Sequence, residues 1–157
     1  MSEKVIEKAL AKDALVLWSK RYATNIPLFD KQHKELVSLT NNLYEACKRK
    51  RGIEEAFKEA IHDMVEYVSK HFAAEVDFME SIGFPEDALA EHKRQHETLI
   101  KEILGAARNY TSGSVSVPNK FVRTLRAWVL SHIAVYDKAY ANFAAERRKN
   151  GAVIDII

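Results

Sequence analysis

The sequence predicts an all-α protein, an antiparallel up-down-up-down four-helix bundle with an N-terminal arm. Apolar residues recur at helical spacing in four long segments, and no segment alternates convincingly enough to be a strand. Glycine and proline are scarce, at 5 and 3 residues, and they cluster at the boundaries of these segments. The connections are short, so consecutive helices are expected to be antiparallel neighbours.

The composition is that of an ordinary globular domain with a core of its own. Of the 157 residues, 47% are hydrophobic and 29% are charged. The formal net charge of +2 is too small to indicate a nucleic acid or a membrane surface as a partner. We divide the chain into the N-terminal arm (1–24), the bundle (25–150) and a C-terminal tail (151–157).

The compartment is inferred from the N-terminus and from the cysteine content. The N-terminus has no apolar core of signal-peptide length, and no apolar run approaches the ~20 residues that cross a bilayer. The single cysteine, Cys47, excludes an internal disulfide, and we interpret it as a small core residue. These features predict a cytoplasmic protein.

The first helix is expected to begin at Asp30, whose carboxylate can cap the free N–H groups of the first turn. It runs through HKELVSLTNNLYEACKRK and ends before Gly52, which can adopt a left-handed cap conformation. The basic residues KRKR favour the negative end of the helix dipole. A nucleic-acid interpretation of KRKR is less favoured, because ERRKNG at 146–151 repeats the same pattern.

The boundaries of the other three helices are predicted mainly from glycine, proline and polar residues between the apolar segments. The second is expected from about Ile53 to Ser81, and Gly83 with Pro85 separates it from the third. The third covers EDALAEHKRQHETLIKEILGAARNY, and the polar loop TSGSVSVPN follows it. The fourth is expected from about Pro118 to Lys149.

Every predicted helix carries at least one of the six histidines, which are His33, His62, His71, His92, His96 and His132. His62 lies nine residues before His71, about 2.5 turns, so it faces the opposite side of its helix and is expected at the surface. The other five share their faces with apolar residues and are expected to point into the bundle. Glu75, one turn after His71, and Asp137, which follows His132, are the acidic residues that accompany them.

This set of polar residues predicts a metal site in the core. A lone inward histidine is usually satisfied by one hydrogen bond. Five imidazoles and two carboxylates cannot easily satisfy one another, because deprotonated carboxylates only accept hydrogen bonds. Isolated buried charges are costly, whereas divalent cations bind both groups, and bundle cores often hold paired metal sites. Seven ligands exceed the needs of one tetrahedral zinc, so we expect two metal ions bridged by the carboxylates.

The spacing between His132 and Asp137 does not fit an ideal α-helix. Five residues turn about 140° beyond one full turn, so the two side chains would not share a face. Either the aspartate reaches across by its own geometry, or the helix is locally distorted, and a π-type bulge is one such distortion. Periodicity alone would not select Asp137 as a ligand.

The predicted ligand set is rich in histidine and poor in carboxylate. Neutral imidazoles add less negative charge than carboxylates, so two ferrous ions in this site would keep a net positive charge. We infer that this disfavours the high-valent iron states that oxidise C–H bonds. It favours reversible two-electron chemistry with a small ligand.

The order His33, His71-x-x-x-Glu75, His92-x-x-x-His96 and His132-x-x-x-x-Asp137 resembles the full pattern of the hemerythrin family. The stretches IPLFDKQHKELV, YVSKHFAAEVDFM and FVRTLRAWVLSHIAVYDKAY are similar to bacterial members of that family. The resemblance covers roughly residues 15–145 as one domain. Seven ligands in order at fixed spacings are far more specific than a single His-x-x-x-Glu pair.

The resemblance implies a role for each residue of the pattern. The coordinatively saturated iron ion would be held by His92, His96 and His132. The second iron ion would be held by His33 and His71, which leaves one position open for O2. The bridges between the ions (Fe2+ or Fe3+) would be Glu75, Asp137 and an oxo or hydroxo group.

An apolar pocket is expected around the open position, because water and protons promote autoxidation. Val129, one turn before His132, and Ile133 are the candidates for its wall. Trp128, Tyr67 and Phe72 could contribute, although ordinary core packing explains each of them singly. Tyr67 and Tyr136 could form hydrogen bonds to the ligands.

The expected function is reversible O2 binding for storage, delivery or buffering, without enzymatic turnover. One alternative is signalling of O2, NO or the redox state to a partner, because hemerythrin domains are also found attached to sensory modules. Turnover of peroxide or NO is less favoured, because no general base is evident beyond the ligands. The apolar end IDII of the tail GAVIDII is expected to dock on the protein's own bundle, with docking on a partner as the alternative.

Overall fold

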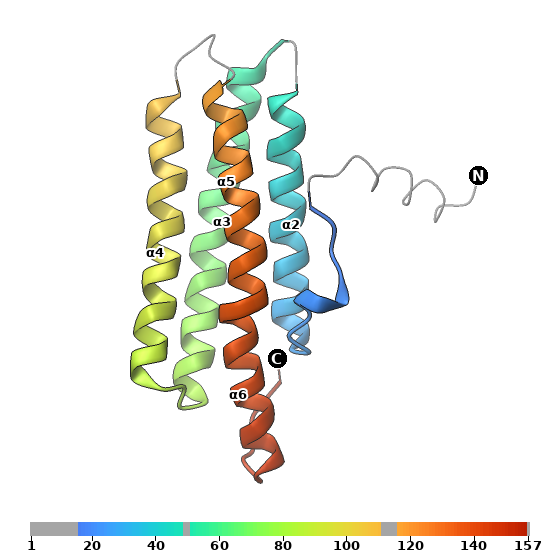
Figure 1. Ribbon diagram of the computed structural model, residues 1–157, viewed down its shortest axis with the longest axis vertical. Helices are drawn as coiled ribbons and strands as arrows, with labels where there is room; N and C mark the ends of the chain where they lie inside the picture. Colours follow the sequence, from blue (N-terminus) through green and yellow to red (C-terminus); the bar gives the residue numbers. More distant parts are fainter. Residues whose placement is uncertain (1–15, 49–50, 111–115, 157) are drawn as a thin grey trace, which may run out of the picture.

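The computed structural model describes residues 16–48, 51–110 and 116–156. Four long helical segments lie side by side and alternate in direction, which confirms the predicted bundle (Figure 1). The first three are α2 (Pro27–Cys47), α3 (Ile53–Ser81) and α4 (Glu86–Asn109). The fourth consists of α5 (Ser116–His132), a π-helical turn η2 (Ile133–Asp137) and α6 (Lys138–Lys149). Within these residues, no helix is both long and apolar enough to cross a membrane.

The helix boundaries agree with the sequence in most places, and both ends of α2 are corrections. Helix α2 ends at Cys47 and Lys48 follows it as the C-cap, so its last turn holds no basic residue, contrary to the prediction for KRKR. Arg49 and Lys50 lie outside the described residues.

Helix α2 begins at Pro27, because proline suits the first turn of a helix, and Ile26 precedes it without a side-chain cap. Asp30 therefore lies inside the first turn, where its Oδ1 accepts hydrogen bonds from the backbone N–H and the hydroxyl of Thr24 at 2.6 and 2.8 Å. The expected left-handed Gly52 is confirmed, with φ +67°.

The N-terminal arm lies along α2, and the part of it before Val16 falls outside the described residues. The backbone of Val16 exchanges two hydrogen bonds of 2.9 Å with the side-chain amide of Asn41. A short 3₁₀ helix, η1 (Lys20–Tyr22), follows, and its Tyr22 is buried. The arm thus contributes the ring of Tyr22 to the core, and the partly buried ring of Trp18 packs against it. The boundary at residue 24 remains a prediction.

Two hydrophobic clusters fill the bundle. The larger cluster includes Cys47, Val129 and Ile133, and all three are buried as the sequence predicts. Burial raises the pKa of the Cys47 thiol to about 11, so it stays protonated and packs as a small apolar group. The smaller cluster lies towards the other end of the bundle and contains Phe29 and Tyr140.

The C-terminal tail docks on its own bundle, as expected from the sequence. Ile154 and Ile156 pack against the smaller cluster. Arg147 donates a hydrogen bond from Nη1 to the carbonyl oxygen of Ile82 at 2.6 Å, which ties α6 to the end of α3 just before the tail begins. Val153, between these contacts, is 97% exposed.

We expect Ile154→Ala to lower the free energy of unfolding by about 1 kcal/mol, because it removes half of the tail's apolar contact with the core. Urea denaturation followed by circular dichroism measures the change. The matched control is Val153→Ala in the same tail, which should change the stability by less than about 0.5 kcal/mol. Equal effects of the two substitutions would mean that the tail does not pack on the bundle in solution.

Candidate metal centre

The structure brings together the side chains of all seven predicted ligands. None of them is more than 4% exposed, although an isolated polar group in such a place is costly. All four long segments contribute, and the residues are His33 from α2, His71 and Glu75 from α3, His92 and His96 from α4, His132 from α5 and Asp137 from η2. His62, by contrast, has a side chain that is 77% exposed, as predicted.

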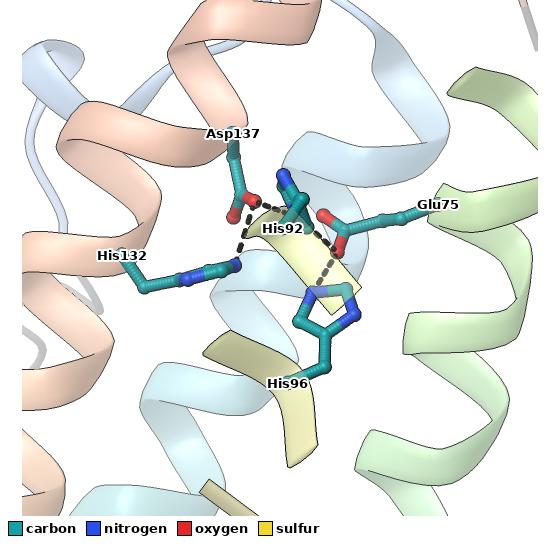
Figure 2. Close-up of side chains that lie close together, drawn as sticks. All are labelled: Glu75, His92, His96, His132 and Asp137. Carbon is teal, nitrogen blue, oxygen red and sulfur yellow. Dashed lines mark ion pairs between the residues drawn. The ribbon is translucent and has the colours of Figure 1, made fainter. Parts of the chain in front are cut away.

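The seven residues form two overlapping groups around two shared carboxylates. In each group the potential ligand atoms all lie within 4.8 Å of one another. The five-residue group, drawn in Figure 2, consists of Glu75, His92, His96, His132 and Asp137. The four-residue group consists of His33, His71, Glu75 and Asp137.

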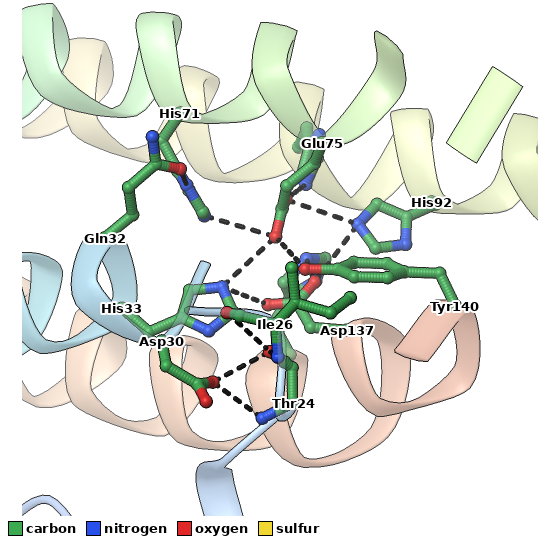
Figure 3. Close-up of polar contacts among 12 residues, drawn as sticks. Thr24, Ile26, Asp30, Gln32, His33, His71, Glu75, His92, Asp137 and Tyr140 are labelled. Atoms are coloured by element: carbon green, nitrogen blue, oxygen red, sulfur yellow. Dashed lines mark hydrogen bonds and ion pairs between the residues drawn. The ribbon is translucent and has the colours of Figure 1, made fainter. Parts of the chain in front are cut away.

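Each carboxylate directs one oxygen to each group of histidines. Glu75 Oε2 lies 3.0 Å from His96 Nε2, and Asp137 Oδ1 lies 3.1 Å from His132 Nε2 and 3.2 Å from His92 Nε2. On the other side, Glu75 Oε1 lies 3.1 Å from His33 Nε2 and 3.2 Å from His71 Nε2 (Figure 3). Asp137 Oδ2 lies 3.0 Å from His33 Nε2. This division of oxygens is the arrangement that two bridging carboxylates need.

The five-residue group passes a direct test of fit to a metal ion. Besides His132 Nδ1, five of its buried atoms have no hydrogen-bond partner, although the groups lie close together. They are Glu75 Oε2, His92 Nε2, His96 Nε2, His132 Nε2 and Asp137 Oδ1. Buried polar atoms almost always have a hydrogen-bond partner, so five unsatisfied atoms at one place require an explanation. A cation between them would satisfy all five.

The π-helical turn η2 explains how Asp137 joins His132. The turn covers Ile133–Asp137, immediately after His132. A π-helix has i to i+5 hydrogen bonds, so residues five apart return to the same side of the helix. Of the two explanations that the sequence left open, the local distortion is therefore the one observed.

Comparison with known proteins agrees with this geometry. The family model for the hemerythrin HHE cation binding domain matches residues 24–144. The chain belongs to the hemerythrin family. A bacteriohemerythrin from Stenotrophomonas maltophilia is 30% identical over 146 residues, which cover 88% of this chain and 92% of that protein. A bacteriohemerythrin from Pseudomonas aeruginosa is 30% identical over 129 residues, covering 82% and 81%.

Solved structures show the same fold. Crystal structures of two single-residue mutants of a hemerythrin, in which one leucine is replaced by tyrosine or by alanine, align with a TM-score of 0.73 at 25% identity. Each alignment covers 84% of this chain and 98% of the other. The cation-binding description of the family agrees with the donor set of the buried centre and supports non-haem iron as its metal.

Gln32 orients His71 in this hemerythrin, a role that the sequence did not reveal. His71 Nδ1–H donates a hydrogen bond to Gln32 Oε1 at 2.6 Å, so the lone pair of Nε2 faces Glu75. The hydroxyl of Tyr67 donates to the backbone carbonyl of Gln32 at 2.8 Å and so holds this part of α2 in place. The predicted hydrogen bond from Tyr67 thus exists, but it reaches His71 only through Gln32.

Tyr140 is the second residue that sequence reasoning missed. Its hydroxyl donates a hydrogen bond to Glu75 Oε1 at 2.8 Å (Figure 3). Burial raises the pKa of the Tyr140 phenol well above its usual value, so it remains a donor. Its position three residues after Asp137, on the same helical face, was the available signal. Tyr136, which was expected to form a hydrogen bond, instead stacks on His132 with ring centroids 5.4 Å apart.

Aromatic rings restrain three of the histidines. The stacked pairs, with their centroid distances, are Phe72–His96 at 3.7 Å, Trp128–His132 at 4.2 Å and Tyr67–His71 at 6.3 Å. Trp128, Tyr67 and Phe72 were expected near the centre, and each contacts a predicted ligand. Val129 and Ile133 are at most 1% exposed, but their role as the wall of an O2 pocket remains a prediction.

The charges of the metal-free centre follow from its carboxylates. Burial alone would raise the pKa of the Glu75 carboxyl, but the neighbouring imidazoles, first that of His71, hold it well below its usual range. Burial also lowers the pKa of His33 and His92, yet the carboxylates outweigh it and raise these values to about 10 and about 9. For His96 burial prevails and lowers the pKa to about 4.

We expect Gln32→Leu to weaken metal binding by about 10- to 100-fold, because His71 would lose the partner that fixes its tautomer and ring orientation. Competition with a chelator of known affinity measures this. The control is Gln95→Leu, since Gln95 bonds only to the nearby Glu91 of α4 and not to the centre. An unchanged affinity in Gln32→Leu would exclude the orienting role.

Metal binding should release about three protons per chain at pH 7.5, two from His33 and His92 and one from the water molecule that would supply the hydroxo bridge. His33 and His92 have raised pKa values, so both are protonated in the metal-free protein at this pH and must lose a proton to ligate. A pH indicator in weakly buffered solution, during addition of Fe2+ under argon, measures the release. His62→Ala should leave the number unchanged, and His33→Gln should lower it by about one. Release of one proton or none would contradict the assigned charges.

Proposed function

We propose that this hemerythrin binds O2 reversibly at a centre of two non-haem iron ions, and that it acts as a carrier or store rather than as an enzyme. The observation that carries the proposal is the unequal division of the histidines. Three of them lie on one side of the shared carboxylates and two on the other. An ion with fewer protein ligands keeps a position open, which is the mark of a reactive site rather than a structural one.

The residues divide into three roles in this proposal. One ion is held by His92, His96 and His132, and the other by His33 and His71. Glu75 and Asp137 would bridge the two ions beside an oxo or hydroxo group. The distribution of their oxygens between the histidine groups supports this assignment.

The iron ions would supply the electrons that O2 takes up on binding and returns on release. The protein would limit the reaction to this reversible exchange of electrons by giving the iron ions a ligand set with little negative charge. Five imidazoles and only two carboxylates leave the centre less negative than a carboxylate-rich one. Tyr140 withdraws further charge by donating a hydrogen bond to Glu75 Oε1, on the side of the two histidines.

The burial of the centre supports a carrier. Water and protons promote loss of bound O2 as a reduced product, and the packed clusters on both sides exclude them. Phe29, which is fully buried, packs its edge against His71 at 6.3 Å between centroids. Among the described buried residues, the acids and bases other than the seven are the Tyr22 and Tyr140 phenols and the Cys47 thiol. No dedicated general base for turnover is thus present among them.

An anaerobic optical titration tests the proposal. The iron-loaded protein is reduced, O2 is admitted, and the solution is then purged with argon. We expect a charge-transfer band that appears with O2 and disappears on purging, because the burial and the histidine-rich ligand set oppose irreversible oxidation. An irreversible change to the diferric spectrum would instead favour sensing or turnover.

Two variants make the same experiment specific to the bridged centre. Glu75→Ala and Asp137→Ala each remove an oxygen from both histidine groups at once, so neither should hold two ions or show the reversible band. Iron analysis measures the stoichiometry. Retention of two irons per chain in either variant would refute the bridging assignment.

A further inference from the structure

A groove of about 430 Å³ opens on the surface between α3 and α4. Its apolar lining includes Phe72, Ala73 and Val76 of α3 and Ile100 of α4. His96 also lines it, although the Nε2 of the same ring lies 3.0 Å from Glu75 Oε2 in the buried centre. A single imidazole therefore separates the surface groove from the predicted metal site.

His96 is the most accessible of the seven predicted ligands. It is 4% exposed, whereas the other six are between 0 and 2% exposed. Its ring is stacked on Phe72 with centroids 3.7 Å apart and planes 5° apart, so the two rings form one wall between the groove and the centre. Its Nε2 points away from the groove and faces Glu75 Oε2 of the centre, 3.0 Å away.

The groove carries two carboxylates that the fold does not use. Asp77 of α3 and Glu97 of α4 both line it and are exposed. Neither forms an ion pair or hydrogen bond with another residue in the described part of the chain. The cation of the groove, Lys93, lies 3.5 Å from Glu80, so its charge is already compensated. The groove thus presents uncompensated negative charge from both helices.

We propose that this groove is the route by which Fe2+ reaches the buried centre. Asp77 and Glu97 would bind the incoming ion first, because carboxylates suit a hydrated divalent cation. His96 would then turn with Phe72, receive the ion on Nε2 and carry it to Glu75. The inference rests on the proposed function, since it assumes that the centre holds iron. Metal loading would thus use one face of the protein, and O2 binding would use the other, on the side of His33 and His71.

The rate of iron uptake tests the route. Metal-free protein is mixed with Fe2+ under argon, and free Fe2+ is trapped by a chelator at timed intervals. The double variant Asp77→Asn/Glu97→Gln should take up iron about ten-fold more slowly, because the local attraction for the cation is lost. Its final content should equal that of the unmodified protein, at two irons per chain, because no ligand of the centre is changed.

A matched control uses the groove between α2 and α3, which Glu59 and Asp63 line and no predicted ligand reaches. The variant Glu59→Gln/Asp63→Asn makes the same change in net charge, and its uptake rate should stay within about two-fold of the unmodified rate. Equal slowing of both double variants would mean that only the overall charge matters, which would overturn the route.

A second variant blocks the groove without changing its charge. Ala73→Leu places a larger side chain in the hollow, and both residues are good helix formers, so α3 should remain intact. Slower uptake with an unchanged circular dichroism spectrum and final iron content supports the route. Unmodified rates in both groove variants overturn it, and so does a reduced final iron content in Asp77→Asn/Glu97→Gln. Failure of the unmodified protein to take up two irons would count against the proposed function instead.

Discussion

The structure depends on two buried carboxylates, each shared between two groups of histidines. Glu75 and Asp137 are at most 1% exposed, and each directs its two oxygens in different directions. Such a pair is costly to bury, so the surrounding helices must supply compensating partners at fixed positions. This requirement sets the register of α3, which carries Glu75, and the backbone distortion in η2, which carries Asp137.

The remaining core holds these ligands in place without adding further charge. The larger cluster and the smaller cluster pack on either side of the centre, and the tail extends the smaller one. Gln32 and Tyr140 supply hydrogen bonds where a ligand needs a fixed orientation or charge. His132 has no such bond on Nδ1, and the rings of Trp128 and Tyr136 restrain it by stacking instead. Two kinds of support therefore produce one rigid site.

The two sides of the centre differ in how closely they approach the surface. The side of His33 and His71 is enclosed by Phe29, Gln32 and Tyr140, and the O2 chemistry is proposed there. The side of His96 approaches the surface through the groove between α3 and α4. In the proposed scheme, metal loading and O2 binding use different sides of the centre, so the O2 side would stay closed while the metal is exchanged. One bundle would then allow metal loading and still shield the O2 side from the surface.

The sequence by itself determined the bundle, the extents of its helices to within a few residues, and six of the seven inward side chains. These follow from helical periodicity and from glycine and proline at the boundaries, which are local properties. Asp137 was included through the family resemblance, because its spacing from His132 contradicts an ideal helix. Only the tertiary structure showed the π-helical turn, the hydrogen-bond partners Gln32 and Tyr140, and the groove over His96. These features depend on contacts between helices that are distant in sequence, and the local periodicity of one helix carries no information about such contacts. Asp30 shows the same limit, because its partner is the preceding loop at Thr24 rather than the helix end it was expected to cap.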